Sequence, residues 1–475
     1  MGTPGQRQQK VHLPVYDRAS SLRNDGSRAF PYPADVHGRW NRARNVVFAV
    51  LIVFWAVLPW IRIGGRPAMF LDVPASRFFL FGASFNAQDF WLVFFFTTAL
   101  LFVLVVVTTL LGRVWCGWSC PQTVFLEGLY RPIERAIEGP RNERMRRDAA
   151  PMSWDKLWRK GLKHLLYVLV SAFVAHVFLA YFVSLPSLFE MVTQSPLEHP
   201  EAFGWMVAMT AIFWANFGWF REQLCLVICP YGRLQSVLID DDSMVVGYDV
   251  GRGEPRAKGK RTEDDTRGDC VDCNRCVVVC PTGIDIRNGL QLDCIACTQC
   301  IDACDDVMDK VGKPRGLIRY DSLRGLRGEA RKYFRPRLVL YAVLGVAGLV
   351  AATLALGSRT PFEANLVRMQ GAPYVVERGE DASHDVVRNQ FQIHLVNKRD
   401  QEGAFTIEVI DANGAEVVIA QPELTIEALG DRRVSVIVRE PRRDFERGER
   451  VRLRVMLDGV PEPREIEAPL LGPVL

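Results

Sequence analysis

Eight of the twelve cysteines in this 475-residue chain repeat one spacing twice. The first run reads Cys270-x2-Cys273-x2-Cys276-x3-Cys280-Pro281, and after thirteen intervening positions the second reads Cys294-x2-Cys297-x2-Cys300-x3-Cys304. This is the bacterial ferredoxin spacing, in which a tight loop brings three thiolates to three corners of a [4Fe–4S] cube. A zinc ribbon would need CxxC pairs with longer gaps, and thiols buried only for packing would not fall into this register.

The ferredoxin pattern also predicts which thiols share a cluster, because the fourth cysteine of each run binds the cluster of the other run. We expect one cluster to be bound by Cys270, Cys273, Cys276 and Cys304, and the other by Cys294, Cys297, Cys300 and Cys280. The second run is followed by Asp305 where the first is followed by Pro281. We expect this difference to loosen the second turn without removing a ligand.

The other four cysteines form two copies of a CxxxCP motif. The copies read Trp115-Cys116-Gly-Trp118-Ser-Cys120-Pro121-Gln122 and Leu224-Cys225-Leu-Val-Ile-Cys229-Pro230-Tyr231-Gly232, and each directly follows a long apolar run. Cysteines at i and i+4 share one face of a helix, and a proline after the second suits the first turn of a new helix. The two copies are expected at the same membrane depth, where their four thiols can meet.

Four soft thiolates favour Cu(I), zinc or an iron–sulfur centre. Beside two one-electron carriers they indicate a redox-active soft metal, with copper the strongest candidate. The plainer interpretation is that these cysteines are small hydrophobic residues in packed helices. His164 is a weaker candidate for a ligand or proton relay, and His176, inside the same apolar run, is expected to make structural hydrogen bonds.

Five apolar runs must carry these motifs. Four of them are 19 to 25 residues long and contain no Asp, Glu, Lys or Arg: Trp91–Leu111, Leu165–Phe189, Ala202–Phe220 and Leu338–Ser358. A bilayer core about 30 Å thick needs roughly 20 apolar residues in a helix, so each run predicts a membrane span. Val46–Ile61 has only 16 residues, but it contains aromatic anchors and is counted as the first of five spans.

The basic residues in the connections predict the orientation of the spans. Eight Lys and Arg residues precede Asn45 and ten lie in 113–160, whereas 62–88 carries three and 185–201 none. Because basic loops stay in the cytoplasm, the N-terminus and the cysteine runs are expected there, and the C-terminus outside. The cytoplasm is also the reducing compartment that keeps thiols free. The basic leader is too long for a cleavable signal peptide.

The tail after the last span predicts an all-β domain. Short alternating runs begin at Phe391, Phe405, Val417, Val434 and Val451, with hairpin signals at 411–414 and 458–459. Roughly seven strands suit an immunoglobulin-like sandwich, although the cysteine pair and core tryptophan of antibody domains are absent. His384 and His394 are expected to be ordinary surface or packing residues.

The chain is therefore expected to be a multi-domain membrane protein with five parts. These are a cytoplasmic basic leader (1–44), a four-helix membrane region with both CxxxCP motifs (45–235), a two-cluster ferredoxin insert (236–335), a fifth transmembrane helix (336–359) and an exported β sandwich (360–475). The charge-rich segment 127–147 is expected to be a solvated helix. A net charge of +4 argues against a nucleic-acid binder, and the cysteine distribution argues against a disulfide-stapled secreted protein.

The order of these parts resembles the cytochrome c oxidase accessory protein family, the FixG/RdxA/CcoG-like membrane ferredoxins. The resemblance lies in WCGWSCPQ, CPYGRLQ, the block CVDCNRCVVVCPTGIDIRNGLQLDCIACTQCIDACDDVMDK and the exported β tail. It implies a multi-pass protein of the bacterial inner membrane with a periplasmic β domain. It also implies a cupric reductase activity that supplies Cu(I) for assembly of cbb-type oxidase, with clusters on the eight run cysteines and a copper or redox site at Cys116, Cys120, Cys225 and Cys229.

The expected function is electron transfer from a cytoplasmic donor to Cu(II) at the paired CxxxCP motifs. The expected partners are that donor, oxidase-assembly and copper-delivery proteins, and membrane lipid, with no nucleic acid. Two other classes stay open. A quinol dehydrogenase component would exchange electrons with a membrane quinone, and a non-redox assembly scaffold or copper carrier would need clusters only for folding.

Overall fold

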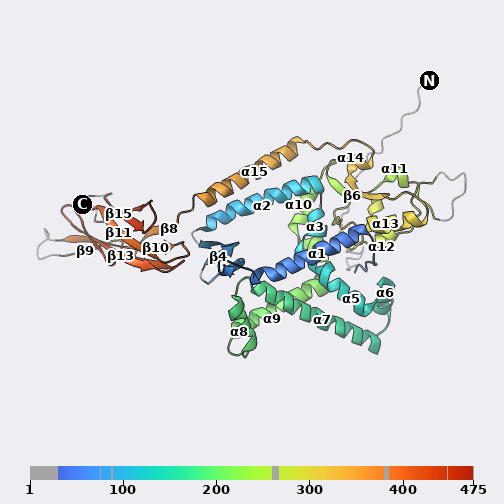
Figure 1. The fold of residues 1–475 in the computed structure, drawn as a ribbon, viewed down its shortest axis with the longest axis horizontal. Coiled ribbons are helices and arrows are strands. Elements are labelled where there is room, and N and C mark those ends of the chain that lie inside the picture. Colours follow the sequence, from blue (N-terminus) through green and yellow to red (C-terminus); the bar gives the residue numbers. More distant parts are fainter. Residues whose placement is uncertain are drawn as a thin grey trace, which may run out of the picture. The chain divides into compact units, whose positions relative to one another are not determined.

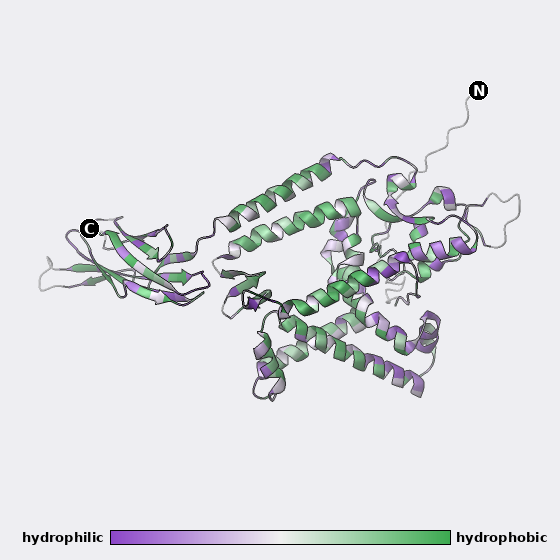
Figure 2. Ribbon diagram, viewed as in Figure 1, coloured by the Kyte–Doolittle hydropathy of each residue, from purple (hydrophilic) through white to green (hydrophobic). Residues whose placement is uncertain are grey.

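Four helices are long and apolar enough to cross a membrane. The computed structural model describes residues 30–74, 76–86, 89–258, 267–378, 385–446 and 448–473. Within these ranges the four helices are α1 (Arg39–Val57, continued by a 3-10 turn to Trp60), α2 (Phe90–Leu111), α7 (Trp154–Leu179) and α15 (Pro336–Gly357). Figure 2 shows them as largely hydrophobic, and many of their large apolar side chains are exposed. Apolar surface of this extent suits lipid contact, so the chain is a membrane protein.

The segment predicted as the fourth span changes from an α-helix to a π-helical turn along its length. It forms α9 (Pro200–Ala215) and then a π-helical turn (Asn216–Phe220). The 16 residues of α9 alone would span about 24 Å, which is less than a bilayer core, so the π turn must contribute to a crossing. α9 packs along α7. A fifth crossing at this segment therefore stays a prediction.

The third span begins and ends earlier than its uncharged run suggested. α7 begins after Ser153, whose hydroxyl accepts a hydrogen bond from the Lys156 backbone N–H (3.3 Å), and it ends at Leu179 rather than Phe189. A separate helix, α8 (Leu185–Thr193), starts after the capping residue Ser184. The prediction of one span to Phe189 was wrong because Ser184 and Pro186 form a helix start inside the apolar run.

Short elements connect the spans. After α1 come β1 (Arg62–Ile63), β2 (Arg66–Pro67) and the antiparallel pair β3 (Met69–Asp72) and β4 (Arg77–Leu80). After α2 come α3 (Val114–Trp118), α4 (Pro121–Phe125), a π turn (Leu126–Tyr130), α5 (Arg131–Glu138) and α6 (Arg141–Ala149).

α15 approaches α2 closely at two glycines. A Cβ at Gly345 would lie 3.3 Å from Phe102, and one at Gly348 would lie 3.8 Å from Ala99. Small residues commonly allow such contact between membrane helices.

The two cysteine runs lie in a small α/β domain between α9 and α15. Its elements are α10 (Pro230–Leu238), β6 (Met244–Tyr248), α11 (Val250–Gly253), α12 (Arg275–Val278), a 3-10 turn (Ile286–Asn288), α13 (Gln299–Lys310), β7 (Ile318–Ser322) and α14 (Leu323–Leu326). β6 and β7 pair in antiparallel register, with Val246 opposite Tyr320. Buried Val246, Ile284, Ile286 and Ile301 belong to the core that contacts the cysteines.

Three membrane-helix ends meet this domain on the same side (Figure 1). At the start of α1, the Asn41 backbone N–H donates to Asp302 of α13 (2.7 Å). After the end of α2, Gly112 lies directly against the Met244 carbonyl. Before the start of α15, Arg335 forms an ion pair with Asp240. The arrangement agrees with helices that alternate in direction through a membrane.

The second compact unit comprises residues 84–90 and 353–475 and is a two-sheet β sandwich. One sheet has the order β12-β14-β10-β8 with β9 also beside β10, and the other has the order β13-β11-β15-β16. The strands are β8 (Phe362–Arg368), β9 (Val375–Glu377), β10 (Val386–Asn397), β11 (Gly403–Asp411), β12 (Glu416–Ile419), β13 (Glu423–Ile426), β14 (Asp431–Pro441), β15 (Arg450–Leu457) and β16 (Arg464–Pro469). Alternate residues such as Phe391 and Leu453 fill the core. All five predicted runs form strands, which confirms the all-β tail.

One of the two hairpin signals was wrong. Residues 411–414 do form a turn, with Asn413 and Gly414 at φ 45° and 87°, but β11 and β12 on either side belong to different sheets. The turn carries the chain across the sandwich because β12 pairs with β14. The turn at 458–459 joins the paired strands β15 and β16, as predicted. His394 forms a surface pair with Asp431 (2.8 Å), and His384 lies outside the described residues.

A buried ion network attaches residues 84–90 to the sandwich. Asp89 is 2% exposed and accepts from Arg359 Nε (3.0 Å) and Lys398 Nζ (2.6 Å), and Lys398 also contacts Glu363. Arg359 lies over the ring of Phe85, 5.0 Å from its centroid. The segment before α2 is thus part of the β unit.

We predict that Asp89→Ala destabilises this unit by roughly 3 kcal/mol, because it removes the buried carboxylate that pairs with both Arg359 and Lys398. The measurement is the thermal midpoint of protease resistance of the sandwich in the full-length protein. Asp431→Ala is the matched control, since its pair with His394 is exposed and should contribute less than about 1 kcal/mol. Equal midpoints for the two variants would contradict the prediction.

Candidate metal centres

Both cysteine runs have the same unusual backbone. Asp272 and Asn274 in the first run have φ of 50° and 56°, and Ala296 and Thr298 at the equivalent positions of the second have 53° and 64°. Left-handed conformations cost energy for residues other than glycine, and they concentrate at functional sites. In each run they curl the chain tightly just before a helix, α12 or α13. The two runs are therefore structural copies.

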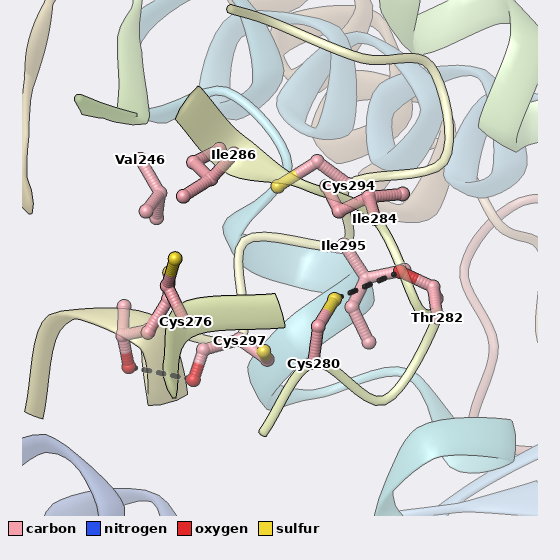
Figure 3. A pocket seen from close by; sticks show the side chains of 11 residues that line it. Val246, Cys276, Cys280, Thr282, Ile284, Ile286, Cys294, Ile295 and Cys297 are labelled. Carbon is pink, nitrogen blue, oxygen red and sulfur yellow. Dashed lines mark hydrogen bonds between the residues drawn. The ribbon is translucent and has the colours of Figure 1, made fainter. Parts of the chain in front are cut away.

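Each run borders one cavity, and the fourth cysteine at that cavity comes from the other run. The first cavity is lined by Cys270, Cys273, Cys276 and Cys304. The second is lined by Cys280, Cys294, Cys297 and Cys300, and also by Cys276, which borders both cavities. Figure 3 shows Cys276, Cys280, Cys294 and Cys297 grouped around this second space with their sulfur atoms turned toward it. This is the arrangement that the predicted exchange of fourth ligands requires.

The chemistry of these cavities suits a [4Fe–4S] group. Burial raises the pKa of Cys276 and Cys304 to about 12 and that of Cys294 to about 11, so these thiols stay protonated at neutral pH unless a cation binds. Apolar side chains such as Ile284 and Ile286 exclude water from the second cavity. In the described part of the chain no three ligand-type side chains are close enough to hold a single ion. Four thiols spread around a cavity suit a four-iron cube better.

The replacement of proline by Asp305 does not loosen the second run, contrary to our expectation. Cys280 and Pro281 follow the end of the four-residue helix α12, whereas Asp305 lies inside the 12-residue helix α13. A proline in that interior would remove a helical hydrogen bond and clash with the preceding turn. Asp305 instead accepts a hydrogen bond from the Gly316 backbone N–H (2.9 Å).

The two CxxxCP motifs also share one geometry, but not the single helix that was predicted. Cys116 lies in α3 and Cys225 in a π turn (Leu224–Ile228), while Cys120 and Cys229 are the residues that precede α4 and α10. In both motifs the N–H of the second cysteine donates to the carbonyl five residues before it, at 2.8 Å. The helix stops between the cysteines because a residue before proline disfavours the α conformation.

The four CxxxCP cysteines lie near enough for their charges to interact, although no three of their thiols are close enough to hold a single ion. Burial raises the pKa of Cys116 to about 12 and also raises that of Cys225, and the neighbouring thiols of Cys120 and Cys229 add to both effects. Burial likewise raises the pKa of Cys120, although the N–H groups at the start of α4 oppose the rise. Cys116 donates to the side-chain oxygen of Gln235 (3.1 Å). A thiolate in this group is therefore disfavoured unless a cation accompanies it.

The first CxxxCP motif touches the second cysteine run. A Cβ at Gly117 would lie 2.5 Å from the Ile295 carbonyl oxygen, so only glycine allows this approach. Arg113, one residue before α3, donates to the carbonyls of Leu292 and Cys294, the latter at 3.3 Å. The second cavity is therefore the one beside the four CxxxCP thiols.

One face of the segment 127–147 is buried, whereas residues such as Glu143 and Arg146 are exposed, so the prediction of a solvated helix was wrong for the buried face. Its charged side chains join a network with at most 8% exposure, made of Arg44, Glu127, Arg131, Glu134, Arg144, Arg221 and Glu222. Burial alone would raise the pKa of Glu134, but Arg221 and Arg144 hold it at about 2. The signal was present in the sequence, since positions 127, 131, 134 and 138 follow the spacing of one helix face.

The described contacts of the two histidine candidates are with a carbonyl and with aromatic rings. Nδ1 of His176 hydrogen bonds with the Ala172 carbonyl (2.8 Å), as expected of a structural residue. His164 packs against the rings of Tyr167 and Trp214, with ring centroids 6.0 and 5.9 Å away. Neither contact favours a role as a metal ligand.

Comparisons with known proteins agree with this arrangement. Residues 220–323 match a 4Fe-4S dicluster domain, residues 90–140 a 4Fe-4S binding domain, and residues 352–473 the Ig-like fold at the C-terminus of FixG. The chain is 34% identical to nitrogen fixation protein FixG of Rhizobium meliloti over 474 residues, which cover 91% of this chain and 86% of that protein. It is 34% identical to protein RdxA of Cereibacter sphaeroides (81% of this chain, 82% of that protein) and 35% identical to RdxB of the same organism (80% and 81%).

We predict that Gly117→Ala weakens the contact between the CxxxCP motifs and the second run, because its Cβ would meet a backbone carbonyl. Overpacking of this kind costs about 1–3 kcal/mol. The variant should lose iron faster than the wild type when it is incubated anaerobically with a chelator. Gly161→Ala is the control, since nothing lies within 4 Å of a Cβ there. Equal rates of iron loss for both variants would show that the contact does not hold the second run in place.

Proposed function

The chain belongs to the FixG/RdxA family of membrane iron–sulfur electron-transfer proteins, and from this premise we propose that it reduces Cu(II) to Cu(I) at the four CxxxCP cysteines. The observation that carries the proposal is the contact between Gly117 of the first motif and Ile295 of the second run. The contact joins the first motif to a residue that lines the second cavity, which supports electron transfer from that cavity to the CxxxCP thiols. Thiolates bind Cu(I) more strongly than Cu(II), so the ligands favour the product of the reduction.

The proposed electron path starts at the first cavity. Cys273 is the most exposed of the eight run cysteines, which supports entry of electrons from a cytoplasmic donor at this cavity. The second cavity follows, since Cys276 borders both. The four CxxxCP thiols come last. A [4Fe–4S] group bound in each cavity supplies one-electron chemistry, so one electron arriving at the thiols converts one Cu(II) into one Cu(I).

The protein's own residues prepare this site for copper. Cys120 and Cys229 directly precede α4 and α10, and backbone N–H groups at the start of α4 oppose the rise that burial causes in the pKa of Cys120. The buried thiols lose their protons when the metal ion enters, because burial disfavours thiolates without a cation. Gln235, beside Cys116, has a fully buried side chain that accepts the thiol hydrogen in the metal-free state.

In the cell, we propose that this protein is a multi-pass inner-membrane protein with its N-terminus and ferredoxin domain in the cytoplasm and its β sandwich in the periplasm. The basic residues of 113–160 and of the leader support this orientation. The Cu(I) would serve assembly of cbb-type cytochrome c oxidase, and the sandwich would contact assembly or copper-delivery proteins.

A second candidate is that the four CxxxCP thiols hold an iron–sulfur group of their own. The match of residues 90–140 to a 4Fe-4S binding domain favours it, because that range contains only Cys116 and Cys120 as cysteines. Iron content separates the two candidates, since a copper site adds no iron to the two cubes of the cysteine runs.

We predict that replacing Cys116, Cys120, Cys225 and Cys229 together by serine leaves about eight irons per chain, as two cubes require. Serine keeps the size but offers a hard hydroxyl that binds Cu(I) poorly. The variant should therefore accept electrons from dithionite but transfer them to Cu(II) at least tenfold more slowly, as followed by cluster absorbance. A wild type with about twelve irons that falls to about eight in the variant would favour the second candidate. An unchanged rate would mean that the clusters reduce copper directly.

The orientation gives a separate prediction. A periplasm-dependent reporter fused after Leu475 should be active, and the same reporter inserted near Arg261 should be inactive, because an odd number of spans separates the N-terminus from the tail. The measurement is reporter activity in intact cells at matched expression. Equal activity at both positions would contradict five crossings.

A further inference from the structure

Two buried arginines connect the second cysteine run to the two CxxxCP motifs. Arg44 Nε donates to the carbonyl of Gly117 (3.0 Å) in the first motif. Its Nη1 donates to the side-chain oxygen of Gln299 (2.8 Å), between Cys297 and Cys300, when that amide is oriented to satisfy both neighbours. One guanidinium thus holds the first motif and the second run together.

Arg113 makes the matching connection for the second motif. One of its nitrogens donates to the carbonyls of Leu292 and Cys294 in the second run, and the other donates to the carbonyl of Gly232 after Cys229 (2.9 Å). The side chain is 7% exposed, and that of Arg44 is 1% exposed. Guanidinium groups stay protonated even when buried, so two permanent positive charges lie against the second run.

The acids near these two arginines neutralise them only in part. Glu127 approaches Arg44 at 3.8 Å but makes its close contact with Arg131. The half-buried Asp293 is the carboxylate that faces Arg113, whose described hydrogen bonds all go to uncharged carbonyls. Because an interaction between charges is stronger where water is excluded, both cations act on the second cavity over several ångströms.

Two arginines line the first cavity. Arg287 is paired with two carboxylates, Asp272 (2.6 Å) and Asp285 (2.6 Å), whereas Arg275 donates to the Asp35 carbonyl (3.1 Å). Asp305 follows Cys304 directly and is 8% exposed. The two runs share a backbone geometry but differ in the charges around them.

We propose that Arg44 and Arg113 raise the reduction potential of a cluster in the second cavity and so direct electrons inward from the first cavity. Reduction adds one negative charge to the cluster, and a nearby buried cation stabilises the reduced form more than the oxidised form. The direction of electron flow toward the CxxxCP thiols rests on the proposed function. The effect of the two arginines on the reduction potential of the second-cavity cluster does not, because it requires no copper.

The test is a redox titration of the anaerobically purified full-length protein, followed by electron paramagnetic resonance without added copper. The signal that disappears in Cys297→Ser identifies the second-cavity cluster. Arg113→Gln and, independently, Arg44→Gln should shift the midpoint of that signal to lower potential and leave the other midpoint in place. Arg113→Lys keeps the charge and should retain most of the wild-type midpoint.

Arg287→Gln is the matched control for the other cavity. It should lower the midpoint of the first-cavity signal, because it leaves two aspartates without their cation, and it should not move the second. Unchanged midpoints in both Arg44→Gln and Arg113→Gln, or equal shifts of both signals, would overturn the proposal. The four-serine variant separates this proposal from the proposed function. If it loses copper reduction while both cluster midpoints stay unchanged, the effect of the arginines on the potential is unaffected.

Discussion

The fourth cysteine of each run must reach the cavity of the other run, and this requirement organises the ferredoxin domain. Cys280 follows α12 and Cys304 lies inside α13, so each helix must cross from its own loop to the neighbouring one. The left-handed residues Asn274 and Thr298 make this possible by turning the chain into the helix immediately after the second cysteine. Their backbone strain is tolerated because the surrounding contacts fix it, as is common at functional sites.

The same domain is fastened to the membrane helices by charge rather than by apolar packing alone. Arg44 and Arg113 bond to backbone carbonyls on both sides of the junction, and the network around Arg131, Glu134 and Arg221 lies behind it. Removing one member of a buried ion pair of this kind is strongly destabilising, because the charge that remains is neither paired nor solvated by water. Buried charges therefore hold the junction at the place where the proposed electron path crosses it.

The sequence predicted the iron–sulfur domain because ligand spacing is a local property. Two runs of CxxCxxCxxxC and two CxxxCP motifs specify loops, helix starts and ligand sets without reference to the rest of the fold. The strand runs of the tail were predicted for the same reason, since alternation is visible within a few residues. The sheet partners were not, and the turn at Asn413 joins different sheets because pairing depends on residues far apart, such as Val417 and Val438.

The remaining errors came from treating segments one at a time. The uncharged run 165–189 was predicted as one span, although a new helix starts after Ser184 within it. Charged residues from Glu127 to Arg144 were taken for solvent-facing ones, although Arg221 and Arg44, from distant parts of the chain, bury them. The role of Arg113 could not be predicted either, because nothing in its local sequence indicates that it bonds to Leu292, Cys294 and Gly232.

The exchange of fourth ligands is the central claim, and iron content in two double variants tests it most directly. Cys280→Ser with Cys297→Ser removes two ligands from one cavity, so one cluster of about four irons should survive. Cys280→Ser with Cys276→Ser removes one ligand from each cavity and should leave no intact cluster. If the second pair kept an intact cluster while the first pair lost both, each run would hold its own cluster, and the exchange of fourth ligands would be contradicted.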